Sequence, residues 1–386
     1  MSKPSVGKQE LALVEKVFRS GWLGEGRLTE AFEKSISEFT GAQHVVAVNT
    51  GTSALHLALH ALGVGPGDEV ILPSMTFASD PMAVMLCGAK PVFCDIRAET
   101  LNIDPRKIPP LLTGRTRVIM PTDFAGLPSD VRAIRRALGN RDIKIVRDAS
   151  HSFGSKVNGK RIGVSAGEDI TCFSFDPIKN VTCGEGGALL LKDASLLETV
   201  RSRKILGTVR GAWQRLSKKK NINVDRQVVQ EGFRYHLSDI NAAIGLAQMR
   251  RLPVLLRKRQ QRAKLYDRLL SSNRNVSVFK RDYQMTAPFM YVIRVAAPVR
   301  NELVNFLAKS GIHAGLRYDP CHLQPFFGSR PPRLPVTERV AAEMLSIPLY
   351  SDITVPQVRE VVSRINGFFR EKKLGTVSGG RTPDLS

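Results

Sequence analysis

The sequence lacks the features that mark membrane, zinc-binding and disulfide-bonded proteins. No segment holds 18 uninterrupted apolar residues, and the opening stretch MSKPSVGKQE has no apolar core of the kind found in signal peptides. The five cysteines are odd in number and scattered, with no CxxC pair and no cluster of Cys and His. We therefore expect a cytoplasmic chain with free thiols, no membrane span and no bound metal.

Acidic residues are also scarce. Lys and Arg number 57 against 35 Asp and Glu, which gives a formal net charge of +22. A field of this sign attracts phosphates, so the partner is either nucleic acid or a small anion approaching a solvated basic surface. The densest basic runs, LSKKKN and LRKRQQRAK, carry no interleaved aromatic residues, and the chain has no nucleic-acid-binding motif. The second interpretation is therefore favoured.

Strand-like and helix-like segments alternate over residues 45–200. Most of the short apolar runs are separated by segments with helical spacing, which indicates a mainly parallel sheet covered by helices on both faces. Functional sites in such sheets lie on loops at the strand ends. The predicted strands are 44–48, 69–73, 91–96, 117–122, 143–150, 170–175 and 188–192.

The pattern changes near residue 238, where a helix begins that Pro253 should kink or interrupt. At 386 residues the chain is long enough for two or three folding units, at about 150 residues each. We predict a large domain over 1–249 and a smaller α+β domain over 250–373. The tail 374–386 is predicted to be disordered.

Four loops at the predicted strand ends carry side chains suited to chemistry. In the first, VNTGTSAL, a strand leads through Gly51, Thr52 and Ser53 into a helix, where N–H groups and hydroxyls could bind a phosphate. An ordinary Ser N-cap explains the same pattern, and the Gly-Lys-Ser/Thr ending of a P-loop is missing. In the second loop, PSMTFASD, Phe77 could lie flat on an aromatic ligand or belong to the core.

The other two loops hold a carboxylate and a lysine. Asp148 ends a buried strand, so its carboxylate needs a cationic or hydrogen-bonding partner. That partner could be Arg147 or the protonated ring nitrogen of a cofactor. His151 could touch the same ring or only satisfy a turn. In the fourth loop, Ser174 lies in a strand and Lys179 follows it.

Each of these residues taken singly has an ordinary structural explanation, and a solvated surface turn is the default for Lys179. Their conjunction points further. A phosphate cradle, an aromatic plate, a strand-end carboxylate and a loop lysine follow one another on one predicted sheet. Pyridoxal 5′-phosphate (PLP) requires this set, because its aldehyde forms a Schiff base with a lysine, its pyridinium pairs with a carboxylate and its phosphate needs N–H and O–H donors.

The same segments resemble the DegT/DnrJ/StrS family of sugar aminotransferases, which have the fold type I architecture of PLP-dependent transferases. The resemblance runs from about residue 18 to 370. It is carried by SGWLGEGRLTEAFE, VNTGTSALHLALHALGVGPGDEVILPSMTFASD, RDASHSFGS, FSFDPIKNVTCGEGGALLL, GFRYHLSDINAAIGLAQM and RYDPCHLQPFF. It implies a large α/β/α domain with a mainly parallel sheet and a smaller C-terminal α+β domain.

Carried over by position, the resemblance implies a role for each matching residue. Lys179 is similar to the Schiff-base lysine and Asp148 to the partner of the pyridine nitrogen, which makes them the catalytic pair. The family works as homodimers with shared active sites, here around Arg234. The other implied cofactor contacts are Gly51, Thr52, Ser53, Phe77, His151 and Ser174, and the implied substrate contacts are Gly21, Trp22, Tyr318 and His322.

The sequence departs from the family pattern at several of these places. Arg147 and Ser150 stand in a motif that usually reads Glu-Asp-Ala-Ala, and Asp123 stands where histidine is common. Arg234 replaces the asparagine of GxNxR, and Arg317 replaces a common histidine. These departures bear on substrate identity more than on the chemistry.

The resemblance implies transfer of an amino group from L-glutamate to a nucleotide-linked keto-deoxysugar, with the ketone at position 3 or 4. The product would be an amino sugar for polysaccharide or natural-product biosynthesis. Two alternatives stay open. One is a sugar dehydratase of the same family, although the resembling dehydratases have histidine at the lysine position. The other is a non-catalytic sensory or nucleic-acid-binding relative.

Overall fold

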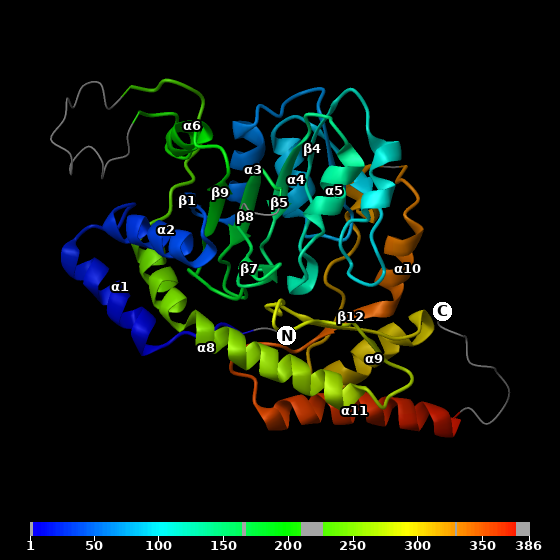
Figure 1. The fold of residues 1–386 in the computed structure, drawn as a ribbon. Coiled ribbons are helices and arrows are strands. Elements are labelled where there is room, and N and C mark those ends of the chain that lie inside the picture. Colours follow the sequence, from blue (N-terminus) through cyan, green and yellow to red (C-terminus); the bar gives the residue numbers. More distant parts are fainter. Residues whose placement is uncertain (1–2, 164–166, 210–226, 329, 376–386) are drawn as a thin grey trace.

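A seven-stranded sheet forms the centre of the larger part of the molecule (Figure 1). The computed structural model describes residues 3–163, 167–209, 227–328 and 330–375. The strand order is β1-β9-β8-β5-β4-β2-β3, and neighbours are parallel except where β9 pairs with β1 and β8. The mainly parallel sheet predicted from the sequence is confirmed. Its strands are β1 (His44–Val48), β2 (Glu69–Pro73), β3 (Lys90–Cys94), β4 (Thr116–Ile119), β5 (Lys144–Asp148), β8 (Ile170–Ser174) and β9 (Gly187–Leu191).

Helices cover both faces of this sheet because successive strand residues point to opposite sides. In β1, Val46 and Val48 belong to the apolar cluster with α3 and α4, whereas Val45 and Ala47 belong to the cluster with α2 and α8. α5 packs on the second face as well, against Ile145 and its neighbours. These helices are α1 (Lys8–Ser20), α2 (Arg27–Thr40), α3 (Gly51–Ala61), α4 (Ser79–Leu86), α5 (Val131–Leu138), α6 (Leu196–Arg203) and α8 (Asp239–Leu270), and a short hairpin is formed by β6 (Lys156–Val157) and β7 (Lys160–Arg161).

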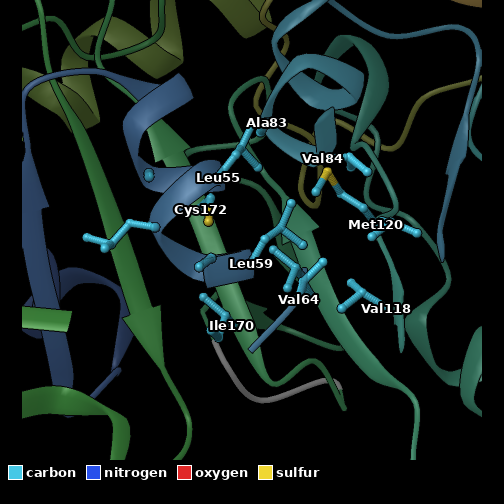
Figure 2. Packing of buried hydrophobic residues seen from close by; sticks show 14 of the residues in the cluster. Leu55, Leu59, Val64, Ala83, Val84, Val118, Met120, Ile170 and Cys172 are labelled. Atoms are coloured by element: carbon cyan, nitrogen blue, oxygen red, sulfur yellow. The ribbon is translucent and has the colours of Figure 1, made fainter. Parts of the chain in front are cut away.

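The core beneath α3 fixes where the first turn of that helix lies. Figure 2 shows Leu55 and Leu59 of α3 next to Cys172 and Ile170 of β8, with Met120 and Val118 to their right. All of these side chains are buried. Close packing of this kind leaves little room for movement, so the helix start is held against the end of the strand.

The C-terminal part forms a second, smaller layer of its own. A three-stranded antiparallel sheet, in the order β10-β11-β12, packs with α9, α11 and the second half of α8 around buried residues that include Tyr266, Tyr291 and Ile365. None of the helices in the described ranges combines the length and apolar character that crossing a membrane requires. The elements are β10 (Ser277–Val278), β11 (Tyr291–Arg294), α9 (Ala297–Lys309), α10 (Pro335–Glu343), β12 (Met344–Ile347) and α11 (Val355–Gly375).

Of the two effects expected of Pro253, a kink or an interruption, the interruption is absent. Pro253 does not interrupt its helix, because α8 runs unbroken for 32 residues and crosses the predicted boundary at 249/250. Pro253 is exposed while Leu252, Leu255 and Leu256 are buried, so packing offsets the cost of a helical proline, about 3 kcal/mol, and water can reach the carbonyl left without a donor. α11 extends to Gly375, and the rest of the predicted tail lies outside the described residues.

Candidate active site

The first part of the site is the start of α3. Thr50 caps the helix by accepting a hydrogen bond from the N–H of Ser53 at 3.0 Å, and the Ser53 hydroxyl donates to Asn49 at 2.7 Å. Gly51 and Thr52 begin the helix, so their N–H groups have no partner within it. The positive end of the helix dipole and these free donors make this turn suitable for an anion.

The end of β8 lies directly against this turn. A Cβ atom added to Gly51 would stand 2.6 Å from the Cβ of Ser174, closer than any side chain tolerates. The sequence therefore needs glycine at position 51 for its size. This contact places the Ser174 hydroxyl beside the first N–H groups of α3, as the sequence predicts for a phosphate cradle.

A cluster of rings surrounds the amine of Lys179. The Nζ atom lies 4.6 Å from the centre of the Phe289 ring. His151 stacks on the same ring, with centroids 4.3 Å apart and planes inclined by 15°. The hydroxyl of Tyr318 lies 3.3 Å from His151 Nε2. The structure thus brings together Lys179, His151 and Tyr318, which come from distant parts of the sequence.

Lys179 differs electrostatically from a surface lysine. Its side chain keeps some solvent contact, but protein surrounds the amine, and this desolvation lowers the pKa of Lys179 below 10.5. Asp148 opposes the shift because its charge favours the ammonium form, and Asp176 acts in the same direction. An amine with a depressed pKa releases and takes up a proton more readily near neutral pH.

Asp148 ends β5 and points into the same region. Burial raises the pKa of Asp148, while the hydrogen bond from the N–H of Ser150 at 2.9 Å and the charge of Lys179 oppose that shift. Desolvation also lowers the pKa of His151 well below 6.5, so its ring is neutral. The Nδ1 atom of His151 is buried and has no hydrogen-bond partner in the described part of the chain.

Phe77 stands at the edge of this cluster rather than in the core. Its side chain is 53% exposed, and its ring centre lies 5.2 Å from that of Tyr318. An exposed ring beside buried polar groups leaves one aromatic face available to a planar ligand.

Sequence reasoning missed Asp80, which lies in the first turn of α4 and is fully buried. Its carboxylate accepts hydrogen bonds from the hydroxyls of Thr76 at 2.6 Å and Thr122 at 2.8 Å. Burial raises its pKa well above 3.8, and the charge of Asp148 adds to that effect. An acidic residue in a first helical turn is ordinary, so the sequence offers no signal of this burial.

Arg147 is not the partner of Asp148. The two are consecutive in β5, so their side chains leave opposite faces of the sheet. The Nε atom of Arg147 instead donates to both carboxylate oxygens of Asp123, at 3.1 and 2.9 Å. The carboxylate of Asp148 is therefore left facing Lys179 and the polar cluster.

Three residues assigned by the resemblance line a separate groove, although the carbonyl of Arg234 accepts from the side-chain amide of Asn49 at 3.4 Å, beside the start of α3. Gly21, Trp22 and Arg234 line a groove of about 830 Å³ between α2, α6 and the segments beside them, and none of Lys179, Asp148 and His151 lines it. The indole N–H of Trp22 donates to the carbonyl of Glu25 at 3.0 Å.

His322 is enclosed by hydrogen-bonding partners of its own. Its ring has no exposed surface, and its Nδ1 and Nε2 atoms lie 2.6 Å from the Ser74 hydroxyl and 3.4 Å from Glu338. The structure therefore leaves no polar ring atom of His322 for a substrate, contrary to the expectation drawn from the motif.

The residues gathered here fit PLP. The buried, unpaired Nδ1 of His151, the crowded cradle at Gly51 and the half-desolvated Lys179 opposite Asp148 each match one part of that group. The fold and this polar cluster at the strand ends define a PLP-dependent enzyme with the aminotransferase architecture.

Comparison with known proteins identifies the group more closely. A model of the DegT/DnrJ/EryC1/StrS aminotransferase family matches residues 4–366, so the chain belongs to that family. The aminotransferase TlmJ from Streptoalloteichus hindustanus is 32% identical and superposes with a TM-score of 0.89, over 96% of this chain and 99% of TlmJ.

Two further solved structures are similar. PseC of Helicobacter pylori, an aminotransferase involved in the biosynthesis of pseudoaminic acid, is 25% identical with a TM-score of 0.88, over 96% of this chain and 98% of PseC. NtdA of Bacillus subtilis, solved with bound cofactor PMP, is 27% identical with a TM-score of 0.84, over 94% of this chain and 81% of NtdA.

Proposed function

We propose that this chain transfers the amino group of L-glutamate to the ketone of a nucleotide-linked 3- or 4-keto-deoxysugar. The product would be an amino sugar for polysaccharide or natural-product biosynthesis in the cytoplasm. The observation that carries the proposal is the amine of Lys179, which is desolvated beside Asp148 and the His151–Phe289 stack. A lysine placed in this way suits proton transfer, which a solvated lysine does poorly.

The residues divide the work between holding PLP and moving protons. Lys179, Asp148, His151 and Phe77 would hold the ring end, and the start of α3 with Ser174 would hold the phosphate. When bound, the cofactor supplies an aldehyde carbon and a ring that accepts electrons. Every acid–base role then falls to protein groups.

Two of these groups act on protons directly. Asp148 would hold a proton on the ring nitrogen through its buried carboxylate. Burial raises the pKa of Asp148, and the hydrogen bond from Ser150 and the charge of Lys179 oppose that rise, as a cationic ring would. Lys179, once its amine is free, takes the proton from the α-carbon of glutamate. In the second half-reaction it delivers a proton to the sugar carbon that receives the nitrogen. His151, which is neutral, can donate a hydrogen bond to the cofactor's phenolic oxygen.

The proposal includes a homodimer with shared sites. It is supported by the groove that holds Gly21, Trp22 and Arg234, because a second subunit is one way for these residues to reach a cofactor. Mixing inactive Lys179→Ala with inactive Arg234→Ala protein tests this. Mixed dimers would carry one intact site, so about a quarter of wild-type activity should return. Activity no higher than the sum of the two variants would contradict shared sites.

The function itself is tested with the holoenzyme, glutamate and a panel of 3- and 4-keto nucleotide sugars, with product mass as the readout. We expect amination of at least one sugar and release of 2-oxoglutarate. Loss of a hydroxyl without gain of nitrogen would instead identify a dehydratase, against which Lys179 already argues. The net charge of +22 favours a second candidate function, that of a nucleic-acid-binding relative. Retention of random DNA in a gel shift at physiological salt, together with no response to glutamate, would support that alternative.

A further inference from the structure

Arg317 directly precedes Tyr318, whose hydroxyl lies 3.3 Å from His151 of the cluster around Lys179. Among the described residues, no hydrogen bond, ion pair or ring contact engages the guanidinium of Arg317. Many arginines of the chain are exposed, whereas Arg317 is half-buried and follows a fixed point of the small domain. Gly315 exchanges two backbone hydrogen bonds with Ser346, at 3.1 and 2.8 Å, only two residues earlier.

The next residue places Arg317 next to the chemistry. Tyr318 reaches His151 with its hydroxyl at 3.3 Å, and its ring lies 5.2 Å from that of Phe77. The charge of Arg317 affects the pKa of both Lys179 and His151. Desolvation is the largest cause of the lowered pKa of Lys179 and of His151, and Arg317 lowers both further.

A guanidinium that has no partner among the described residues is available to bind an anionic ligand. Asp148 and Asp176 face Lys179, and Asp80 is satisfied by two hydroxyls, so none of these carboxylates neutralises Arg317. The planar guanidinium can give two parallel hydrogen bonds to a carboxylate, which a histidine at this position could not.

The position relative to Lys179 selects the anion. In an amino acid, the α-carboxylate is bonded to the carbon whose proton Lys179 moves, so it must lie within a few ångströms of that amine. In a nucleotide sugar, the sugar ring separates the ketone from the diphosphate. We infer that Arg317 binds the α-carboxylate of the amino donor, an assignment that rests on the proposed function. The class of ligand is therefore an α-amino acid, held by the small domain against the cofactor.

The test separates the two half-reactions of Arg317→Gln, measured with loaded enzyme by the change in cofactor absorbance. The non-reacting donor 2-methylglutamate, which lacks the α-proton, reports binding alone through its spectral shift. We expect its dissociation constant to rise about 10- to 100-fold, since hydrogen bonds to charged groups contribute about 1.5–3 kcal/mol. The half-reaction with the keto sugar should stay within about threefold, because its anionic group lies elsewhere.

Two further variants sharpen this result. Arg317→Lys keeps the positive charge but lacks the paired N–H donors of the guanidinium, so it should recover part of the affinity for 2-methylglutamate. Arg330→Gln removes an equally basic, exposed side chain from the same region and should bind 2-methylglutamate like the wild type. Unchanged circular dichroism and cofactor spectra in all three variants show that they are folded and loaded.

Three outcomes would overturn the assignment. If Arg317→Gln binds 2-methylglutamate as tightly as the wild type, Arg317 does not contact the α-carboxylate. A normal donor half-reaction with a weakened sugar half-reaction assigns Arg317 to the diphosphate of the acceptor instead. A wild-type enzyme that responds to no amino donor refutes the proposed function, and this inference with it.

Discussion

Arg147 and Asp123 form an ion pair in which neither side chain has exposed surface and Nε lies 2.9 Å from the nearer carboxylate oxygen. Glu168 adds a second carboxylate 3.6 Å from Nη1 of Arg147. Both members of the pair depart from the family pattern, which has glutamate at position 147 and often histidine at position 123. Because the two side chains touch, the departures amount to one coupled exchange of acidic and basic partners across the sheet.

This pair should be costly to break. We expect Arg147→Ala to lower the free energy of unfolding by about 3–5 kcal/mol, since the carboxylate of Asp123 would remain buried without its cation. Chemical denaturation measures the loss. Lys144→Ala, at the start of the same strand, breaks an exposed pair with Asp142 and should cost less than about 1 kcal/mol.

The double variant Arg147→Glu with Asp123→His tests whether the exchange is coupled. It restores the family pattern, so it should be more stable than either single change. Equal or additive losses would show that the two positions are independent.

Replacement of Lys179 by alanine should abolish both the visible absorbance of the loaded protein and all transamination. The reason is that no other amine in the described cluster lies beside Asp148. Spectra and glutamate turnover provide the measurement, and Lys160→Ala, an exposed lysine in the β6–β7 hairpin, serves as the control. Wild-type turnover in the Lys179 variant would refute the role.

Asp148→Asn should keep the cofactor and lose most of the activity. An amide has nearly the same shape but no charge with which to hold a proton on the ring nitrogen, so we expect a decrease of about 100-fold or more. Cofactor content is read from the absorbance and the rate from 2-oxoglutarate release. Undiminished turnover would count against the assignment.

Asp80→Asn should stabilise the cofactor-free protein at neutral pH. Burial and the charge of Asp148 raise the pKa of Asp80 well above 3.8, so the folded chain keeps a proton that the unfolded chain releases near that pH. The free energy of unfolding contributed by this group is therefore full below pH 3.8 and is lost as pH rises toward the folded pKa.

Asparagine cannot ionise, and its amide oxygen can still accept from Thr76 and Thr122. The variant should therefore be more stable than the wild type at pH 7, because it avoids burying a charge. The gain should shrink on acidification. A difference that does not change with pH, measured by denaturant titration, would contradict a buried carboxyl at this position.

Much of the fold was predictable because its signals are local. Apolar runs and turn residues located all seven strands of the large sheet to within a few residues. The position of Asp148 at a strand end and of Lys179 in a loop followed from them. Strand alternation also implies that Arg147 and Asp148 point to opposite faces of the sheet. The sequence does not reveal that Asp123 pairs with Arg147 on the other face.

The sequence by itself determined the order of elements, the loops that carry the chemistry and the identity of the cofactor, since periodicity, turn composition and motif spacing all lie along the chain. Tertiary structure alone decided that Pro253 stays helical, that Asp80 is buried beside Asp148 and that His322 is occupied by Ser74 and Glu338. The physical reason is distance along the chain. Burial and pairing depend on partners tens to hundreds of residues away, and only the packed fold brings those partners into contact.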